Sequence, residues 1–223
     1  MPNSNMNRPN LLENITHIKI HGKNTTFNNY FRTAQEEFKK IVDTSVTEKP
    51  LQEFLEKHPL LLLNAGLKFF YPFGTRRCAL FKKSRFAERY IVDFSFVHVD
   101  STGANWFFIE LERSDVDLFN KKGDPSKHLN HALRQILDWQ AWIKDNRPYA
   151  QNILDRLQMS ADIKKETNFS TDPNFVIIIG RRKMLNEETA RRRNELCNSH
   201  PRLKIITYDR LLEPIDFFND KQY

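Results

Sequence analysis

The residues best suited to chemistry are three carboxylates on two neighbouring predicted strands. The segments 90–99 and 106–112 are rich in β-branched and aromatic residues and flank a turn that contains Gly103, which predicts a hairpin. Side chains alternate along a strand, so Glu110 and Glu112 should project from the same face at the end of the second strand.

The third carboxylate, Asp93, lies in the middle of the first strand. Alternation places it on one face with Ile91 and Ser95, and places Val92 and Phe94 on the other. An unpaired carboxylate inside an apolar strand is costly. The simpler interpretation is that Asp93 pairs with an arginine and that the two glutamates mark a solvent-facing strand end. The functional interpretation is that all three acids serve a divalent cation, because hard cations such as Mg2+ take carboxylate oxygens.

A cation held in this way would suit the hydrolysis of a phosphodiester, in which the attacking water and the reaction centre both carry negative charge. A metal on carboxylates lowers the pKa of bound water and binds phosphate oxygens. On this hypothesis Asp93 and Glu110 supply metal ligands together with the backbone carbonyl of Leu111. Glu112 would bind a second metal or act as the general base.

The elements that must position these acids alternate between helices and strands. Helices are predicted over 27–46, 47–57, 126–145 and 186–197, and further strands over 15–20, 175–179 and 204–208. Glu48 and Gln52 form a polar stripe on the second helix, and Gln135 lies beside the apolar stripe of the third. This order predicts an α/β fold with a central mixed sheet flanked by helices.

The composition agrees with a globular protein that binds a polyanion. The 223 residues are 39% hydrophobic and carry a net charge of +7, with a sequence pI of about 9.4. Positive charge favours nucleic acid as the partner. Two basic segments are either solvated loops or contacts for phosphates, and they are Lys82-Lys83-Ser84-Arg85 and Arg181-Arg182-Lys183.

Two classes of protein are disfavoured. No apolar run approaches the roughly 20 residues of a membrane span, so we expect a cytoplasmic protein without a membrane partner. The chain has 6 glycines, none in a phosphate-cradling pattern, so no nucleotide cofactor is expected.

The spacing of Asp93 and the triplet Glu110-Leu111-Glu112 resembles the PD-(D/E)xK nuclease signature, which has an acid on one strand and an acid-x-lysine triplet on the next. Further segments in order, over roughly residues 45 to 215, resemble the catalytic domain of the Shedu bacterial antiphage nucleases. These segments are Leu51-Gln52-Glu53-Phe54-Leu55-Glu56-Lys57-His58-Pro59, Asp93-Phe94, Gln135-Ile136-Leu137-Asp138-Trp139, Ile178-Ile179-Gly180-Arg181-Arg182 and Thr207-Tyr208-Asp209-Arg210-Leu211-Leu212.

The resemblance implies a restriction-endonuclease-like fold over residues 47–223, after an N-terminal extension of residues 1–46 that carries one helix. It also implies Mg2+-dependent cleavage of DNA in defence against phage, with Mn2+ as a substitute metal and a homo-oligomer as the assembly.

Site residues follow from the same resemblance. Asp93 and Glu110 match the metal ligands, and Gln135 matches a helix residue that borders the active site. Glu48 or Gln52 would approach the site from the helix over 47–57.

Glu112 departs from the family pattern, which has lysine at this position to orient water and stabilise charge. Lys82, Lys83 and Lys127 are candidates for the missing positive charge. Three functions stay open: a metal-dependent DNA endonuclease, which we favour, a catalytically silent nucleic-acid-binding or sensing module with a nuclease fold, and an assembly or regulatory subunit.

Two other groups of charged or titratable residues favour a structural role over the alternatives, which are metal binding for the first group and DNA contact for the second. His128 and His131, three residues apart on a predicted helix, are expected to have surface or packing roles. The run 191–193 is expected to be a solvated helix face.

Overall fold

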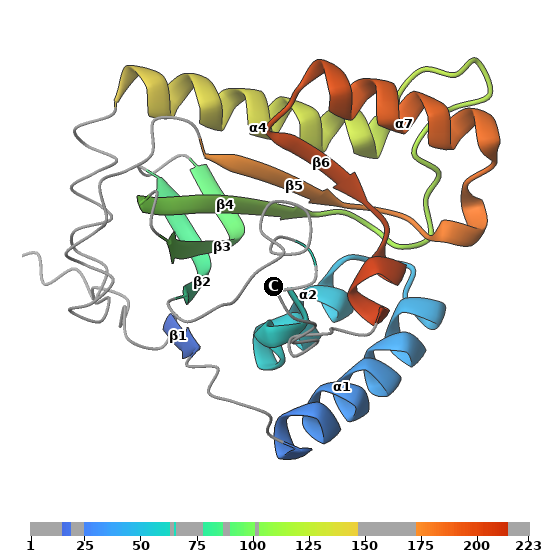
Figure 1. Cartoon of the computed structure of the whole chain (residues 1–223). Coiled ribbons are helices and arrows are strands. Elements are labelled where there is room, and N and C mark those ends of the chain that lie inside the picture. Colours follow the sequence, from blue (N-terminus) through green and yellow to red (C-terminus); the bar gives the residue numbers. More distant parts are fainter. Residues whose placement is uncertain are drawn as a thin grey trace, which may run out of the picture.

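A mixed sheet lies between two layers of helices (Figure 1). The computed structural model describes residues 15–18, 25–62, 65, 78–86, 90–100, 103–146 and 173–213. Within them the sheet has six strands in the order β1-β2-β3-β4-β5-β6. Neighbours from β1 to β4 are antiparallel, and β4, β5 and β6 are parallel. This architecture is a restriction-endonuclease-like α/β fold and confirms the predicted fold class.

The strands are β1 Ile15–Ile18, β2 Cys78–Phe86, β3 Tyr90–Asp100, β4 Gly103–Leu111, β5 Asn174–Ile178 and β6 Leu203–Ile206. The helices are α1 Thr25–Thr44, α2 Lys49–Lys57, α4 Lys127–Asp145 and α7 Glu187–Ser199, with short 3-10 helices η2 Pro59–Leu62, η3 Arg182–Met184 and η4 Tyr208–Leu212. The predicted hairpin is confirmed as β3 and β4. The predicted start of the second helix at Thr47 is two residues early, because Glu48 takes the N-cap position.

The two faces of the sheet carry separate apolar clusters, because side chains of β4 alternate between them. Trp106 and Phe108 pack with α4 on one face, and Phe107 and Ile109 pack with α1 and α2 on the other. Figure 1 shows α4 and α7 above the sheet and α1, α2 and η4 below it. Strand β4 is therefore covered on both sides, and its end reaches between the two helical layers.

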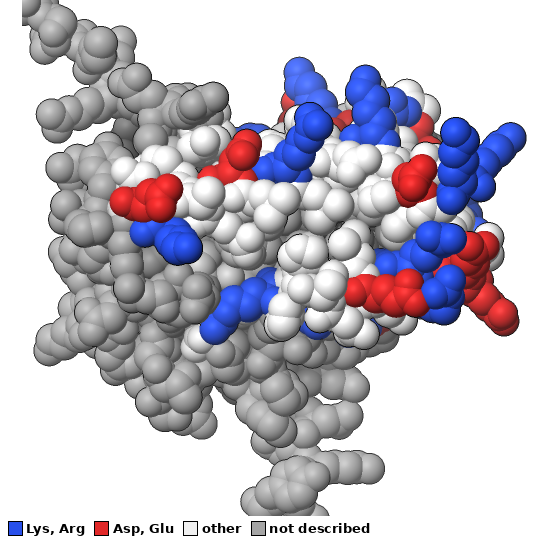
Figure 2. Space-filling view, turned by 90° about the horizontal axis from the view of Figure 1, so that it is seen from above, with Lys and Arg blue, Asp and Glu red and all other residues white. Residues whose placement is uncertain are grey.

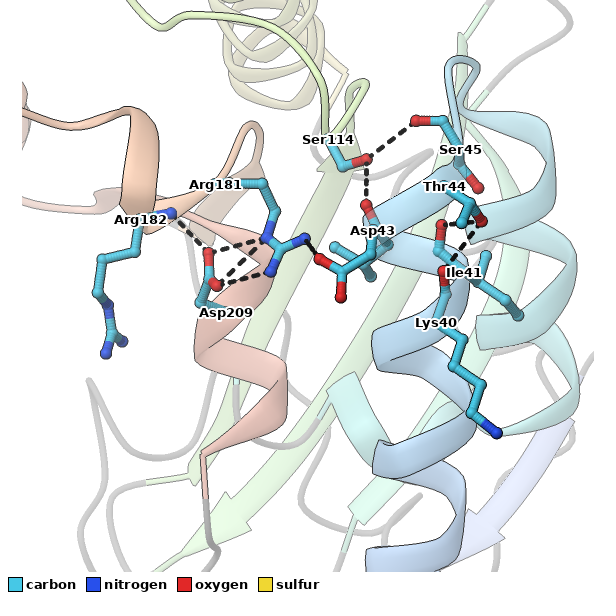
Figure 3. A network of polar contacts seen from close by, with 10 residues as sticks. Lys40, Ile41, Asp43, Thr44, Ser45, Ser114, Arg181, Arg182 and Asp209 are labelled. Carbon is cyan, nitrogen blue, oxygen red and sulfur yellow. Dashed lines mark hydrogen bonds and ion pairs between the residues drawn. The ribbon is translucent and has the colours of Figure 1, made fainter.

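Arg181 links the end of β5 to η4 and to the end of α1 (Figure 3). It follows β5 and is only 7% exposed. Its guanidinium donates to both carboxylate oxygens of Asp209 in η4, at 3.1–3.2 Å, and also to Asp43 near the end of α1. This placement corrects the sequence-based expectation for Arg181, because a guanidinium held by two carboxylates is not presented to a DNA phosphate.

Arg181→Ala is expected to lower the free energy of unfolding by about 2–3 kcal/mol, because it leaves Asp43 and Asp209 without their shared counter-charge. Urea denaturation measures the change. Arg182→Ala is the matched control: its side chain is 62% exposed, so a change within about 0.5 kcal/mol is expected. Equal effects of the two substitutions would contradict the assignment.

Candidate active site

Strands β3 and β4 bring Asp93 and Glu110 to the same end of the sheet. Glu110 occupies the next position after Trp106 and Phe108 on the α4 face, and it is 5% exposed. Asp93 is 7% exposed, and its Oδ2 accepts a hydrogen bond from the backbone N–H of Leu111 at 3.0 Å. The Asp93 carboxylate is thus bound to the residue beside Glu110.

The backbone of β3 changes its course at Asp93. Residue pairs between β3 and β4 run from Asp100↔Gly103 to Phe94↔Ile109, where the described ladder ends. Phe94 packs in the cluster with α1 and α2, whereas Val92 packs in the cluster with α4. The sequence-based expectation that Val92 and Phe94 share a face is therefore wrong. No described ladder pair with β4 constrains β3 on the N-terminal side of Phe94. The Asp93 side chain can therefore accept a hydrogen bond from the backbone of β4.

Lys83 comes to the same point from β2. Its Nζ lies 2.6 Å from Asp93 Oδ1, and its side chain is 40% exposed. The partner of Asp93 is therefore a lysine from the neighbouring strand and not an arginine. Lys83 is also the one non-glycine residue with a positive φ in the described part of the chain, at +48°. Such left-handed backbone is uncommon for residues other than glycine and asparagine.

Glu112 is held by two histidines of α4. Its Oε2 lies 3.0 Å from Nδ1 of His128, and its Oε1 lies 3.0 Å from Nδ1 of His131. The carboxylate is 6% exposed, and the backbone oxygen of Glu112 accepts from the Tyr208 hydroxyl at 2.6 Å. The side chains of His128 and His131 are 34% and 64% exposed, as expected of surface positions, and each also contacts a carboxylate of the triplet, which the sequence did not predict. Their spacing of three residues was the only signal in the sequence.

Burial and mutual repulsion raise the pKa values of two of these acids. Burial, followed by the charges of Asp93, Glu48 and Glu112, raises the pKa of Glu110 well above its ordinary value. Burial, followed by the charges of Asp93 and Glu112, raises the pKa of Glu48 from 4.5 to about 7. Lys83 is the strongest opposing influence on the pKa of both groups. The site carries more negative charge than its own cations balance.

Gln135 extends the polar face of α4 beyond His128 and His131. Its Oε1 is buried and has no hydrogen-bond partner among the residues that the structure describes. A buried acceptor without a donor is unusual and calls for an explanation such as a bound ion. Gln135 lies on the same helix as His128 and His131, which contact the Glu112 carboxylate.

The donor set fits a hard divalent cation. Among the residues that the structure describes, no group of three or more His, Cys, Asp or Glu side chains is arranged so that it could hold a metal ion. Mg2+ does not need one, since it is usually bound through one or two carboxylates and keeps several waters. Asp93 and Glu110, which stand in a site of excess negative charge, meet that requirement.

The remaining predicted site residues are dispersed. Gln52 donates to Glu56 within α2 at 2.8 Å, and Lys82 Nζ lies 3.4 Å from the Glu56 carbonyl. Arg182 pairs with Glu213. The side chain of Arg85 lies outside the described residues. The structure thus gathers Asp93, Glu110, Glu112, Glu48 and Lys83 in one place, whereas the side chains of Gln52, Lys82 and Arg182 contact other partners.

The fold and the buried acids at the end of β3 and β4 define a domain of the restriction-endonuclease-like class. A family model described as "Shedu protein SduA, C-terminal" matches residues 45–212, about three quarters of the chain, and the chain belongs to that family. It is thus a Shedu-type protein related to defence, and this membership suggests nuclease-type activity. No curated protein matches the chain. Among the described helices, none has the length and apolar character needed to cross a bilayer.

In the absence of divalent cations, the free energy of unfolding is expected to fall as pH rises from about 4.5 to about 7. The unfolded chain titrates its glutamates near 4.5, whereas folded Glu48 titrates near 7 and Glu110 is raised too. The folded state binds more protons in this window, so raising the pH destabilises it. Thermal unfolding in EDTA, measured as Tm against pH, tests this.

Glu110→Gln removes one of these buried charges and should raise Tm in EDTA at about pH 8. The expected gain is roughly 2–4 °C, which corresponds to about 1 kcal/mol in a chain of this size. The gain should be smaller at lower pH, because the raised pKa of Glu110 lets the folded carboxyl take up a proton more readily there. Glu37→Gln, an exposed position on α1, is the control and should leave Tm unchanged at both pH values.

His128→Ala is expected to lower the free energy of unfolding by about 1–3 kcal/mol, because it leaves one oxygen of the buried Glu112 carboxylate without its partner. Arg134→Ala, an exposed position on the same helix, is the control. If His128→Ala costs no more than Arg134→Ala, the histidine does not hold Glu112 in solution.

Proposed function

We propose that this chain is a metal-dependent DNA endonuclease that acts in bacterial defence against phage. The observation that carries the proposal is the placement of Asp93 and Glu110. Two buried carboxylates from neighbouring strands lie near the end of β4, close enough for the charge of Asp93 to raise the pKa of Glu110, and Asp93 is bound to the backbone N–H of Leu111. Membership of the Shedu family supports both the chemistry and the role in defence.

Asp93 and Glu110 would hold Mg2+ or Mn2+, together with the carbonyl oxygen of Leu111. A divalent cation supplies Lewis acidity toward a phosphate oxygen and lowers the pKa of bound water. The chain itself orients these ligands through the Leu111 N–H and the β4–β5 ladder, in which Glu112 N–H donates to Ile178 O at 2.9 Å.

Glu48 adds an acid at the N-cap of α2 whose pKa of about 7 suits proton exchange near neutral pH.

The net charge of +7 supports a polyanionic substrate, although the outer helical face does not act as a basic surface. Figure 2 shows acidic and basic side chains interspersed over this face. On α7, Arg191 pairs with Glu195 and Arg192 pairs with Glu188. We therefore propose that the DNA binds elsewhere, with Lys82, Lys83 and Arg182 as the candidate phosphate contacts.

A second candidate is a nuclease-like module that binds nucleic acid without cutting it. One observation favours it: the triplet ends in Glu112, and both oxygens of that carboxylate are engaged by histidines. Such a module would bind DNA with the same affinity in Mg2+ and in EDTA, and would lose affinity when lysines or arginines are replaced.

The decisive measurement is cleavage of linear and circular duplex DNA by the full chain in Mg2+, Mn2+ or EDTA. We expect cleavage in either metal and none in EDTA. Glu110→Ala should lower the single-turnover rate by more than about 100-fold, as expected when a centre that stabilises transition-state charge is lost. Its affinity for DNA should stay within about threefold, because Glu110 is not one of the proposed phosphate contacts.

Asp138→Asn, an exposed acid on α4, is the matched control and should cut at the wild-type rate. Cleavage that persists in EDTA, or in Glu110→Ala, would exclude this carboxylate site. Metal-independent binding without cleavage under every condition would select the non-cutting module instead.

A further inference from the structure

We propose that Lys83, which lies on β2, supplies the positive charge of this active site. In the family pattern that charge comes from a lysine at the third position of the triplet, which is Glu112 in this chain. This inference rests on the proposed nuclease function. It makes Lys83 a catalytic residue that contacts the ligand carboxylate Asp93 and reaches the phosphate or the attacking water.

The first argument is geometric. Lys83 lies opposite Asp93 on adjacent antiparallel strands, between the pairs Lys82↔Phe94 and Ser84↔Val92. Its Nζ is 2.6 Å from Asp93 Oδ1. An ammonium has three N–H donors, so one bond to Asp93 leaves two for a phosphate oxygen or a water. At 40% exposure the side chain is anchored at the acid and still open to a substrate.

The second argument is the backbone of Lys83. A φ of +48° costs energy in a residue with a Cβ, and such conformations persist where the surroundings hold them, often at functional sites. Here the conformation accompanies the ion pair that brings the lysine to Asp93. An exposed lysine on a regular strand would have no comparable constraint.

The third argument is that, of the candidate cations, Lys83 is the one whose contact with a carboxylate of the site the structure shows. Arg113, which follows the triplet, binds Asp115 through Nε at 2.8 Å and a terminal nitrogen at 2.6 Å. Lys82 reaches toward the Glu56 carbonyl of α2, and Lys127 is exposed at the start of α4. Lys83 is the lysine whose charge acts most strongly on Glu48 and Glu110.

Glu112 has a different role from Lys83 in this arrangement. His128 and His131 each approach one of its two oxygens, which fixes the carboxylate against α4. Glu112, at the third position of the triplet, thus links α4 to the end of the sheet. The positive charge beside Asp93 comes from Lys83 on β2, the strand that flanks β3 on the side away from β4.

The test compares Lys83→Met with the wild-type chain in three measurements: single-turnover cleavage in Mn2+, DNA affinity, and Mn2+ affinity by calorimetry without DNA. We expect cleavage to fall about 100-fold, in line with the loss of one charge-stabilising group. DNA affinity should change by less than about threefold, because one of several phosphate contacts is lost. Mn2+ affinity should stay equal or rise, because the lysine no longer competes for Asp93.

Lys144→Met, an exposed position in the last turn of α4, is the control and should match the wild-type chain in all three measurements. If Lys83→Met does not fold, Lys83→Gln replaces it, since the amide keeps a donor for Asp93 without the charge. The same loss of cleavage with retained Mn2+ affinity is then expected.

The outcomes separate this proposal from the proposed function. If the wild-type chain cleaves DNA and Lys83→Met cleaves it at the same rate, the proposal for Lys83 is overturned and the nuclease function is retained. A joint fall of cleavage and Mn2+ affinity overturns it too, because Lys83 would then only hold Asp93 in place. A wild-type chain that cuts under none of the metal conditions removes the nuclease function, and the proposal for Lys83 fails with it.

Discussion

The concentration of negative charge at the end of β4 is the constraint on which the site depends. Asp93, Glu110 and Glu112 are each more than nine-tenths buried, and Glu48 adds a fourth acid from α2. Carboxylates packed in a region of low polarity repel one another strongly. Groups from three elements contact these carboxylates. They are a lysine from β2, two histidines from α4 and a backbone N–H from β4. Glu110 is left with a raised pKa.

The parts of this arrangement that the sequence predicted are those set by local periodicity. Alternation along β4 places Glu110 and Glu112 on one face, and runs of β-branched and aromatic residues predict the strands and their hairpin. The apolar stripe of α4 and its Ser126 cap, which accepts from Leu129 N–H at 3.3 Å, are equally local. Those features need no knowledge of what packs against them.

The parts that the sequence did not predict depend on contacts between distant segments. Lys83 and Asp93 are neighbours only because of the register between β2 and β3, which no local pattern specifies. The contacts of Glu112 with the two histidines depend on how α4 crosses the sheet. Arg181 looked like an exposed basic residue because Asp43 and Asp209, which bury its charge, are far away in the chain. Val92 and Phe94 lie on opposite faces of the sheet, and not on one face as predicted, because the ladder with β4 ends at Phe94. A strict alternation of side chains cannot predict where a ladder ends.

Helix α1 has a consequence for how this protein can be divided. The family match begins at residue 45, just after α1 ends, yet Phe31, Phe38 and Val42 of α1 are buried in the same cluster as strands β3 and β4. Gln35 also donates to the carbonyls of Leu211 and Glu213 at 2.9 and 2.8 Å, which closes the end of η4. A fragment cut at the family boundary would bare a contiguous apolar patch and would be prone to aggregation. The smallest soluble unit therefore has to begin before α1, and the boundary of sequence similarity does not coincide with the boundary of the folding unit.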